Sequence, residues 1–392
     1  MDDTIPGEDN GHADNIVEVQ SYEAPLPPIQ SKAKFLPWHR PRKQYVRHQQ
    51  WCEEILQMIQ DTAPSDGILK YLGLPGVDLL DLRYFHSEVC TKQNVKLRFL
   101  GFNTDAKPQS AAQTELNISL DEVKRLPFVH PLSEVVGDNF SKLADQKSVA
   151  FQKATELGPY DVINLDLCDG FGIHPPGALA NTYYAAVASL MSLQARSSKP
   201  WLLLLTTRTD SPNINAELLQ RLVNKYCSNL EECDAFKDAS RRKFGIETKE
   251  AVGEATGHSE GLLQVFLTGI CKWFLNLALE QKPPTIVELR NAYGYRVVTT
   301  AQHEDLVSLA LRFTPTVLPT VDPLGIANHK HAPPDEGVLA TKALRTIAQR
   351  IDADALLKSD HILLQNMIES TAELLQQARY DPDKYREWAA TA

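Results

Sequence analysis

The chain has 392 residues, of which 43% are hydrophobic and 23% are charged, and its formal net charge is −10. These proportions are ordinary for a soluble globular chain of two to three domains, and the acidic balance argues against a general nucleic-acid coat. The apolar run closest to a membrane span, residues 262–279, is interrupted by Lys272 and Asn276. Residues 1–30 are acidic and lack an apolar signal core, so we expect a cytoplasmic protein with no membrane anchor.

The six cysteines form no CxxC pair and lie in segments expected to be helical or extended. We therefore expect reduced, mostly buried thiols, and we expect no metal site.

The charge inverts after residues 1–30, which we expect to be a disordered acidic tail. No Asp or Glu occurs between residues 24 and 52, where aromatic residues are interleaved with basic ones, among them Arg40, Arg42, Lys43 and Arg47. These cations either bind nucleic acid or an acidic partner, or pack on the acidic body of the same chain. Residues 44–61 then have helical apolar spacing.

Four apolar runs are expected to be strands of a mostly parallel sheet: residues 76–82, 97–102, 162–167 and 201–205. The segments between them are long enough for crossover helices, one of them over residues 178–195. Residues 133–157 are expected to be helical, and no strand is placed between the second and third of these runs. Residues 286–300 and 306–314 are expected to form an antiparallel hairpin, and residues 262–281 a buried helix.

The motifs LLDL (79–82), LGFN (100–103), YDVINLD (160–166) and PWLLLL (200–205) resemble the first, second, fourth and fifth strands of class I S-adenosylmethionine-dependent methyltransferases. The resemblance covers about residues 65–315 and implies a Rossmann-like α/β sheet closed by the antiparallel hairpin. It also implies a cofactor site at the strand ends, with Asp81, Arg83, Asn103, Asp169 and Gly170 as candidate contacts.

Two departures from the family pattern lead us to expect a degenerate cofactor site. With the first strand placed at 79–82, the glycine-rich turn that should follow it is replaced by Arg83 to His86, whose side chains obstruct a close approach. Asn103 stands where the family has an acidic residue for the ribose hydroxyls. Binding of S-adenosylmethionine weaker than about 100 μM is the corresponding expectation.

The stretch from Tyr160 to Gly172 is the most informative part of the chain, because a buried strand there runs into a loop with two glycines. Asp166, Asp169 and His174 are the candidate catalytic group, either as base or as substrate clamp. Asp166 is expected to be buried and Asp169 to reach the crevice. The alternative is that these carboxylates only cap a helix or bond loop amides.

We therefore expect an acidic tail (1–30), a basic arm with a helix (31–64), the methyltransferase-like domain (65–315), a proline-rich linker (316–337) and a helical appendage (338–392). The expected function is a scaffold that meets a protein through the helical appendage and nucleic acid through the basic arm. The alternative is an active methyltransferase with an atypical cofactor loop.

Overall fold

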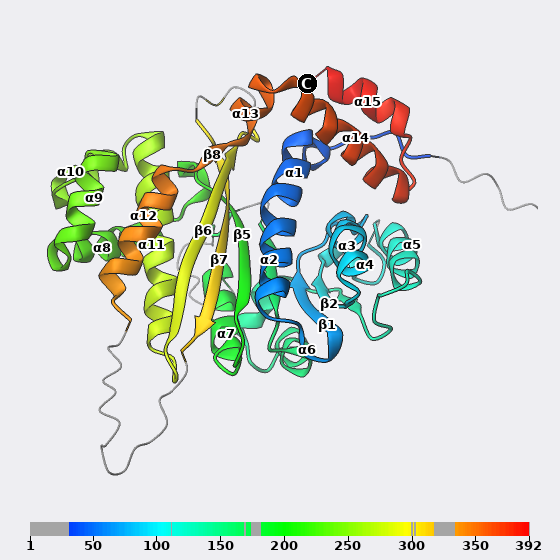
Figure 1. Cartoon of the computed structure of the whole chain (residues 1–392), viewed down its shortest axis with the longest axis horizontal. Coiled ribbons are helices and arrows are strands. Elements are labelled where there is room, and N and C mark those ends of the chain that lie inside the picture. Colours follow the sequence, from blue (N-terminus) through cyan, green and yellow to red (C-terminus); the bar gives the residue numbers. More distant parts are fainter. Residues whose placement is uncertain are drawn as a thin grey trace, which may run out of the picture.

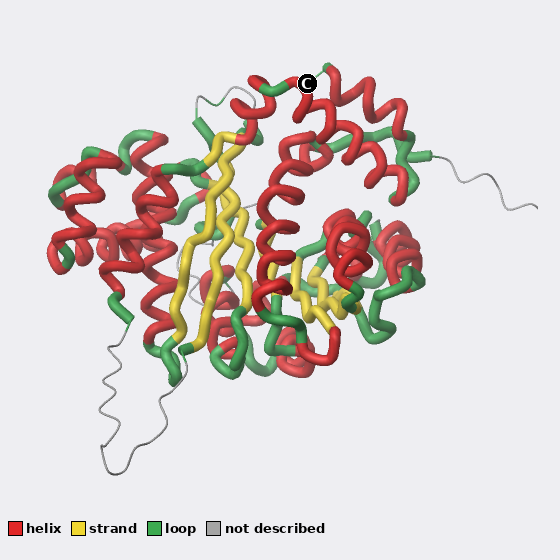
Figure 2. The backbone as a smooth tube through the Cα atoms, in the orientation of Figure 1, coloured by secondary structure: helices red, strands yellow, loops and turns green. Residues whose placement is uncertain are grey.

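The computed structural model describes residues 31–110, 112–167, 170–173, 182–298, 301, 303–316 and 334–391. Its centre is one eight-stranded sheet with helices on both faces (Figures 1 and 2). The strands are β1 (Ile68–Gly73), β2 (Lys96–Phe102), β3 (Glu134–Val136), β4 (Val162–Asp166), β5 (Trp201–Arg208), β6 (Thr285–Tyr295), β7 (Leu306–Pro315) and β8 (Ile351–Asp352). Residues 1–30 and 317–333, expected as tail and linker, lie outside the described residues.

The strand order is β3-β2-β1-β4-β5-β7-β6-β8. Strands β1 to β5 pair in parallel, β7 runs antiparallel to both β5 and β6, and β8 adds a short parallel pair to β6. The expected α/β class, the mostly parallel sheet and the antiparallel hairpin are confirmed. The strand β8 was not expected, because two residues leave no periodic signal.

The strand predicted at residues 76–82 is wrong. The first strand is β1, and Leu80–Phe85 is the helix α3. A short apolar run such as Leu79 to Leu82 fits a buried strand and a buried helix equally well by periodicity. Consequently Pro75 and Gly76 form the turn that follows the first strand, not one that precedes it.

The helix predicted over residues 133–157 is also wrong in its first part. The missing strand β3 lies there, followed by a 3₁₀ helix at Phe140–Ala144 and by α6 (Val149–Leu157). Only three residues of β3 pair with β2, too few for an alternating pattern to stand out.

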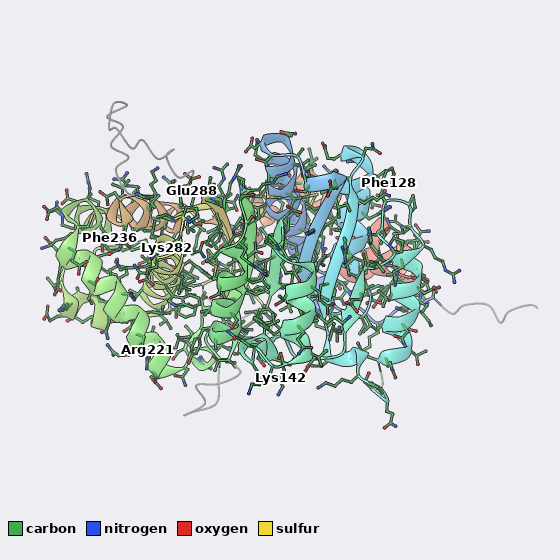
Figure 3. All side chains as sticks on the ribbon, turned by 90° about the horizontal axis from the view of Figure 1, so that it is seen from below. Phe128, Lys142, Arg221, Phe236, Lys282 and Glu288 are labelled. Carbon is green, nitrogen blue, oxygen red and sulfur yellow. The ribbon has the colours of Figure 1, made fainter. Side chains whose placement is uncertain are left out.

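Alternate residues of each strand feed two hydrophobic cores, one on each face of the sheet. On one face Leu72, Ile163 and Leu203 pack with α6, α7 (Tyr183–Gln194), α8 (Ala216–Glu232), α9 (Asp234–Phe244), α10 (Lys249–Ala255), α11 (Ser259–Leu279) and α12 (Glu336–Ala348). In Figure 3 Phe236 lies among these helices, while Arg221 and Lys142 lie on the outside.

The opposite face carries Tyr71, Val162 and Leu204 and is covered by both ends of the described chain. Its helices are α1 (Pro41–Val46), α2 (Glu53–Asp61), α3, α4 (Thr91–Gln93), α5 (Gln113–Lys124), α13 (Ala353–Ser359), α14 (His361–Gln377) and α15 (Pro382–Ala390). A π-helical segment, Arg47–Cys52, joins α1 to α2 and makes them one continuous helix.

Helix α11 is the one helix among the described residues that is long and apolar enough to cross a membrane. Most of it is buried inside the protein: Phe266, Leu267, Ile270 and Phe274 are fully buried. The helix is therefore accounted for as a core element, as its apolar sequence predicted.

The C-terminal helices pack on the basic arm, at the end of the sheet where α1 begins (Figure 1). Phe35 from the arm contacts the rings of Tyr380, Tyr385 and Trp388 at centroid distances of 5.4–5.8 Å. The Lys32 N–H donates to Arg379 O at 2.8 Å, and the Asp381 N–H donates to Lys32 O at 2.9 Å. The helical appendage thus holds the arm against the body of the same chain.

Candidate functional site

Asp166, the last residue of β4, lies where three cavities meet at the carboxyl edge of the sheet. The cavities have volumes of about 170, 260 and 260 Å³, and Asp166 lines all of them. We call them the β5 cavity, the β1 cavity and the β2 cavity after the strand ends that they adjoin. Ligands of open α/β sheets bind at this edge, so the residue singled out in the sequence is at the expected place.

Lys43, from the first turn of α1, forms an ion pair with Asp166. The Lys43 Nζ atom lies 2.6 Å from Asp166 Oδ1 and 3.3 Å from the Tyr295 hydroxyl, and it sits 4.4 Å from the centre of the Trp51 ring. The Lys43 side chain is 6% exposed and that of Asp166 is 24% exposed. Asp166 is therefore partly buried and paired, and its second oxygen has no hydrogen-bond partner among the described residues.

The protonation state of this pair is set by its surroundings. Burial alone lowers the pKa of Lys43, but the charge and hydrogen bond of Asp166, together with the charge of Asp81, outweigh burial and raise that pKa above its ordinary value. Burial raises the pKa of Tyr295 to about 12. At neutral pH Lys43 is therefore an ammonium and Tyr295 a neutral phenol, and both groups can donate hydrogen bonds.

One turn further along the helix, Arg47 forms a second buried ion pair with Asp81. Arg47 Nε lies 2.7 Å from Asp81 Oδ1, and its Nη1 donates to Gln44 Oε1 at 2.6 Å. Arg47 and Asp81 line the β1 cavity together with Lys43 and Asp166. Asp81 thus borders the candidate site, but from α3 and in contact with Arg47.

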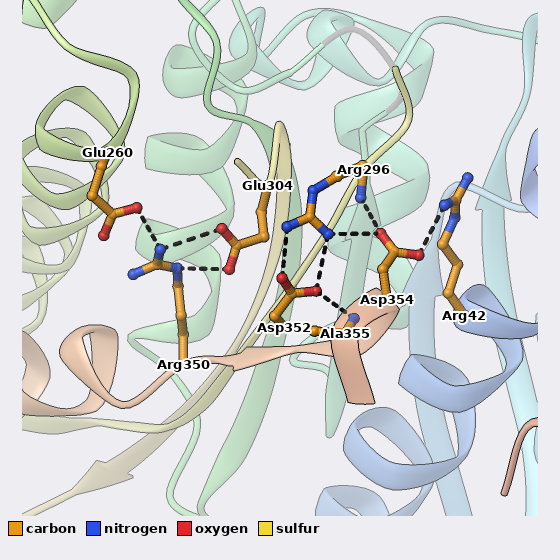
Figure 4. Close-up of polar contacts among 8 residues, drawn as sticks. All are labelled: Arg42, Glu260, Arg296, Glu304, Arg350, Asp352, Asp354 and Ala355. Atoms are coloured by element: carbon orange, nitrogen blue, oxygen red, sulfur yellow. Dashed lines mark hydrogen bonds and ion pairs between the residues drawn. The ribbon is translucent and has the colours of Figure 1, made fainter. Parts of the chain in front are cut away.

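The other two cations of the arm also contact the chain itself. The Arg40 guanidinium lies 3.7 Å from the Trp388 ring centre, and Arg42 Nη1 lies 2.8 Å from Asp354 Oδ1. Figure 4 shows Asp354 between Arg42 and Arg296. Of the two interpretations of the basic arm, the structure displays packing on the acidic body, and it leaves partner binding untested.

The loop after β1 carries the glycines that the sequence was expected to lack there. Gly73 ends the strand, and a Cβ at this position would lie 2.6 Å from the Tyr71 ring. Gly76 lines both the β1 and the β2 cavity, and a Cβ there would meet no atom within 4 Å. Leu79, which starts α3 with a φ of 52°, is in the left-handed region that leucine rarely adopts.

Arg83 and the residues after it do not form this turn. They belong to α3 and the π-helical segment His86–Cys90, not to the loop after the strand. The Arg83 guanidinium is buried, lies 2.5 Å from Glu122 and donates to Asp78 O at 3.0 Å. Arg83 is not among the residues that line the three cavities. The obstruction expected from Arg83 to His86 is therefore wrong, because the strand was placed one element too late.

The second and third strands contribute polar groups to the β2 cavity. Asn103 donates from Nδ2 to Pro75 O at 2.8 Å and accepts from the Asp105 N–H at 2.7 Å, so it ties the end of β2 to the loop after β1. Asp138 and Asn139 follow β3 and line the same cavity. The sequence analysis did not predict these two residues because it did not predict β3. The signal that the sequence offers is the Val-Val-Gly-Asp run at residues 135–138.

Of the loop after β4 the structure describes residues 167 and 170–173, so Gly170 is described, whereas Asp169 and His174 lie outside the described residues. Gly170 has a φ of 88°, and a Cβ there would lie 2.9 Å from Arg208 Cβ. Both facts require glycine, so the loop runs close to the end of β5.

Glu260, His303 and Glu304 are the one group among the described residues whose ligand atoms lie close enough to share a metal ion. Arg350 already bridges the two carboxylates, at 2.6 Å from Glu260 and 3.2 Å from Glu304 (Figure 4). A cation would have to compete with this guanidinium, so the cluster is explained as an ion-pair network.

Comparison with known proteins adds a family and no activity. The family described as PP_RS20740-like matches residues 32–390. No curated protein matches the chain.

Proposed function

The chain belongs to the PP_RS20740-like family, whose description names no activity, and from the geometry of its cleft we propose that it binds S-adenosylmethionine as a methyltransferase. The observation that carries the proposal is the Gly73–Gly76 turn, which leaves open space between the β1 and β2 cavities at the carboxyl end of the first strand. Of the two departures that suggested a degenerate motif, the one at Arg83 to His86 rested on a misplaced strand, while Asn103 does follow the second strand. With the first departure removed, we take the methyltransferase alternative as the stronger one.

The sheet supports the same conclusion. A parallel sheet that ends in an antiparallel hairpin, with β7 inserted between β5 and β6, is the arrangement that the family resemblance implies. The two cavities are about 260 Å³ each and share Leu74, Gly76 and Asp166. Taken together they fall within the range of about 300–1,000 Å³ typical of ligand pockets.

The residues around the turn suit a nucleoside with a charged side chain. Gly76 allows the cofactor to approach the backbone closely, and Asp105 and Asn103 offer oxygen acceptors to ribose hydroxyls. Asp78 and Asp81 also line the β1 cavity, where Asp78 is paired with Lys32 and Asp81 with Arg47. When bound, S-adenosylmethionine would supply a methyl group activated by the positive charge on its sulfur.

Lys43 and Asp166 occupy the side of the cleft that would face the methyl acceptor. Because the pKa of Lys43 is raised, its ammonium donates hydrogen bonds and does not take up a proton. The second oxygen of Asp166, which has no hydrogen-bond partner among the described residues, is the acceptor that remains for a proton of the bound molecule, and Asp166 lines the β5 cavity. The pair would therefore orient the acceptor and hold its proton.

Titration of the purified protein with S-adenosylmethionine by calorimetry tests the proposal. We expect a Kd below about 100 μM, which corresponds to a binding free energy of at least about 5.5 kcal/mol. Gly76→Val should weaken binding at least about tenfold, because its side chain would enter the space between the cavities without meeting other atoms. Gly253→Val, in α10 and also in open space, is the matched control. No binding by the wild-type protein at about 1 mM would refute the proposal.

The scaffold function is the second candidate, and one observation favours it. Lys43 and Arg47 are already paired with Asp166 and Asp81. Such pairing is also found in structural cores that bind no ligand. In that case a protein partner would meet the outer face of the helical appendage, where Ile362 is 77% exposed. Under either function we place the protein in the cytoplasm.

A further inference from the structure

A separate cavity lies beyond the Lys43–Asp166 pair, on the side away from the Gly73–Gly76 turn. This β5 cavity shares Trp38, Lys43 and Asp166 with the β1 cavity, so the ion pair stands between the two. Its lining consists of Pro37, Trp38, Arg42, Lys43, Asp166, Leu167, Arg208, Tyr295, Val297 and Leu306. Nothing in the proposed cofactor site uses this space.

The volume of the β5 cavity suits an occupant of about one ring. Its volume is about 170 Å³, and an apolar cavity of about 150 Å³ is known to hold benzene. Most of its wall is apolar, with Leu167, Val297 and Leu306 among the lining residues. A single aromatic ring fits, whereas two fused rings or a nucleotide would have to extend past the Lys43–Asp166 pair or into solvent.

Trp38 is placed to cover such a ring. Its indole is 48% exposed, the most exposed aromatic ring among the large hydrophobic residues of the described chain, yet it lines two cavities. Exposed Trp side chains are enriched where one face meets a ligand or partner. Stacking of an aromatic ring on this indole would bury apolar surface that the free protein leaves in water.

Arg42 is the cation of the lining that remains for an anion. Lys43 pairs with Asp166, and Arg208 pairs with Asp210 and Asp305, whereas Arg42 shares Asp354 with Arg296. The Arg42 guanidinium contacts Asp354 through Nη1 and has no other ion-pair partner among the described residues, so most of its five N–H donors remain for a ligand. An Arg side chain of this kind pairs well with a planar carboxylate.

We propose that the β5 cavity binds a monocyclic aromatic acid that carries a ring hydroxyl, and that this molecule is the methyl acceptor. Its ring lies against Trp38, its carboxylate meets the Arg42 guanidinium, and its hydroxyl donates to the free oxygen of Asp166. In the transfer the hydroxyl oxygen would bond to the methyl carbon as the carbon–sulfur bond of the sulfonium breaks, the electron pair of that bond would leave with the sulfur as a neutral thioether, and the hydroxyl proton would pass to Asp166. The assignment as acceptor rests on the proposed methyltransferase function, whereas the binding of the aromatic acid does not.

Calorimetric titration with para-hydroxybenzoate, in the absence of cofactor, tests the inference. We expect a Kd below about 1 mM. Val297→Phe should weaken binding at least about tenfold, because Val297 lines the β5 cavity only. Quenching of tryptophan fluorescence by the ligand should be lost in Trp38→Ala, while the fold of both variants is checked by chemical denaturation.

Two comparisons separate this inference from the proposed function. Gly76→Val should lose S-adenosylmethionine and retain para-hydroxybenzoate, and Val297→Phe should do the reverse. Equal affinity for a hydroxynaphthoate or for the saturated hydroxycyclohexane carboxylate would overturn the ring-sized site. So would tighter binding of uridine monophosphate, or no binding of para-hydroxybenzoate up to about 5 mM.

Discussion

The ion pair of Asp166 and Lys43 both lines the candidate site and contributes to the stability of the fold. Removing Asp166 alone leaves an ammonium in a position where only 6% of its side chain reaches water. An unpaired buried charge is costly, whereas removal of both partners is not. The free energy of unfolding of single and double variants therefore tests whether this pair stabilises the fold.

We expect Asp166→Ala to lower the free energy of unfolding by about 3 kcal/mol, somewhat less than for a fully buried pair because Asp166 is 24% exposed. The double variant Lys43→Met with Asp166→Ala should recover at least about 1 kcal/mol of that loss. Denaturant unfolding at neutral pH measures both. Additive losses in the double variant would mean that water, not Asp166, stabilises the Lys43 ammonium.

His39, in the arm, makes stability depend on pH in a defined window. Burial is the main cause that lowers its pKa to about 4, although Asp78 acts in the opposite direction. The side chain is 1% exposed, its Nδ1 accepts from the Leu36 N–H, and its Nε2 has no partner in the described chain. In the unfolded chain a histidine takes up a proton near pH 6.5.

The unfolded state therefore binds more protons than the folded state between pH 6.5 and pH 4, and stability falls as the pH falls through that window. The total loss from His39 is about 3 kcal/mol. We expect the unfolding free energy of His39→Gln to vary less over this range than that of the wild type. Equal pH slopes in the two proteins would show that His39 is not the group responsible.

At the scale of elements, the sequence predicted best where a helix or strand was long and periodic. Strands β2, β4 and β5, the β6–β7 hairpin and the buried helix α11 all lie where expected, because each has a sustained apolar pattern. Strand β1 was missed although Leu69, Tyr71 and Leu72 are buried. The leucine-rich run of α3 directly after it offered a more apolar but false alternative.

The site could be predicted in part for the same reason. Asp166 was found because it follows a clear strand, while its partner Lys43 comes from a helix more than a hundred residues earlier. Such a pairing depends on how α1 crosses the sheet, which no local pattern encodes. The Gly73–Gly76 turn was not recognised because the first strand was placed at residues 76–82 and not at β1.

The contact between the arm and the C-terminal helices lies outside the cleft. Its removal should nevertheless loosen the arm, which carries residues that line the cleft. Trp388→Ala would take away the ring that contacts Phe35 and lies against the Arg40 guanidinium. We expect amide hydrogen exchange of residues 32–40 to speed up at least about tenfold, a change of at least about 1.4 kcal/mol in local opening, while β5 stays protected. Ile362→Ala, on the exposed side of α14, is the matched control. An unchanged arm would show that α1 alone holds it.

At the scale of the whole molecule, the charge distribution bears on nucleic-acid binding. The net charge is −10, and the four cations proposed for this role contact Trp388, Asp354, Asp166 and Asp81 of the same chain. We expect no salt-dependent binding of single- or double-stranded nucleic acid at low ionic strength. Binding whose salt dependence flattens by about 0.7–0.9 log units for each cation removed would contradict this and return the arm to a phosphate-binding role.

The backbone bridge of Lys32 with Arg379 and Asp381 also sets the order in which the protein can be completed. Its two sides are almost the entire described chain apart, so it closes the longest loop in the fold. During synthesis the arm is made long before its binding surface on α14 and α15. Until then Phe35 lacks its aromatic partners, and the arm that carries Trp38 and Lys43 is not fastened over the strand ends. Synthesis must therefore pass residue 381 before the arm can close the β1 and β5 cavities, and a chain that stops earlier can fold its sheet without them.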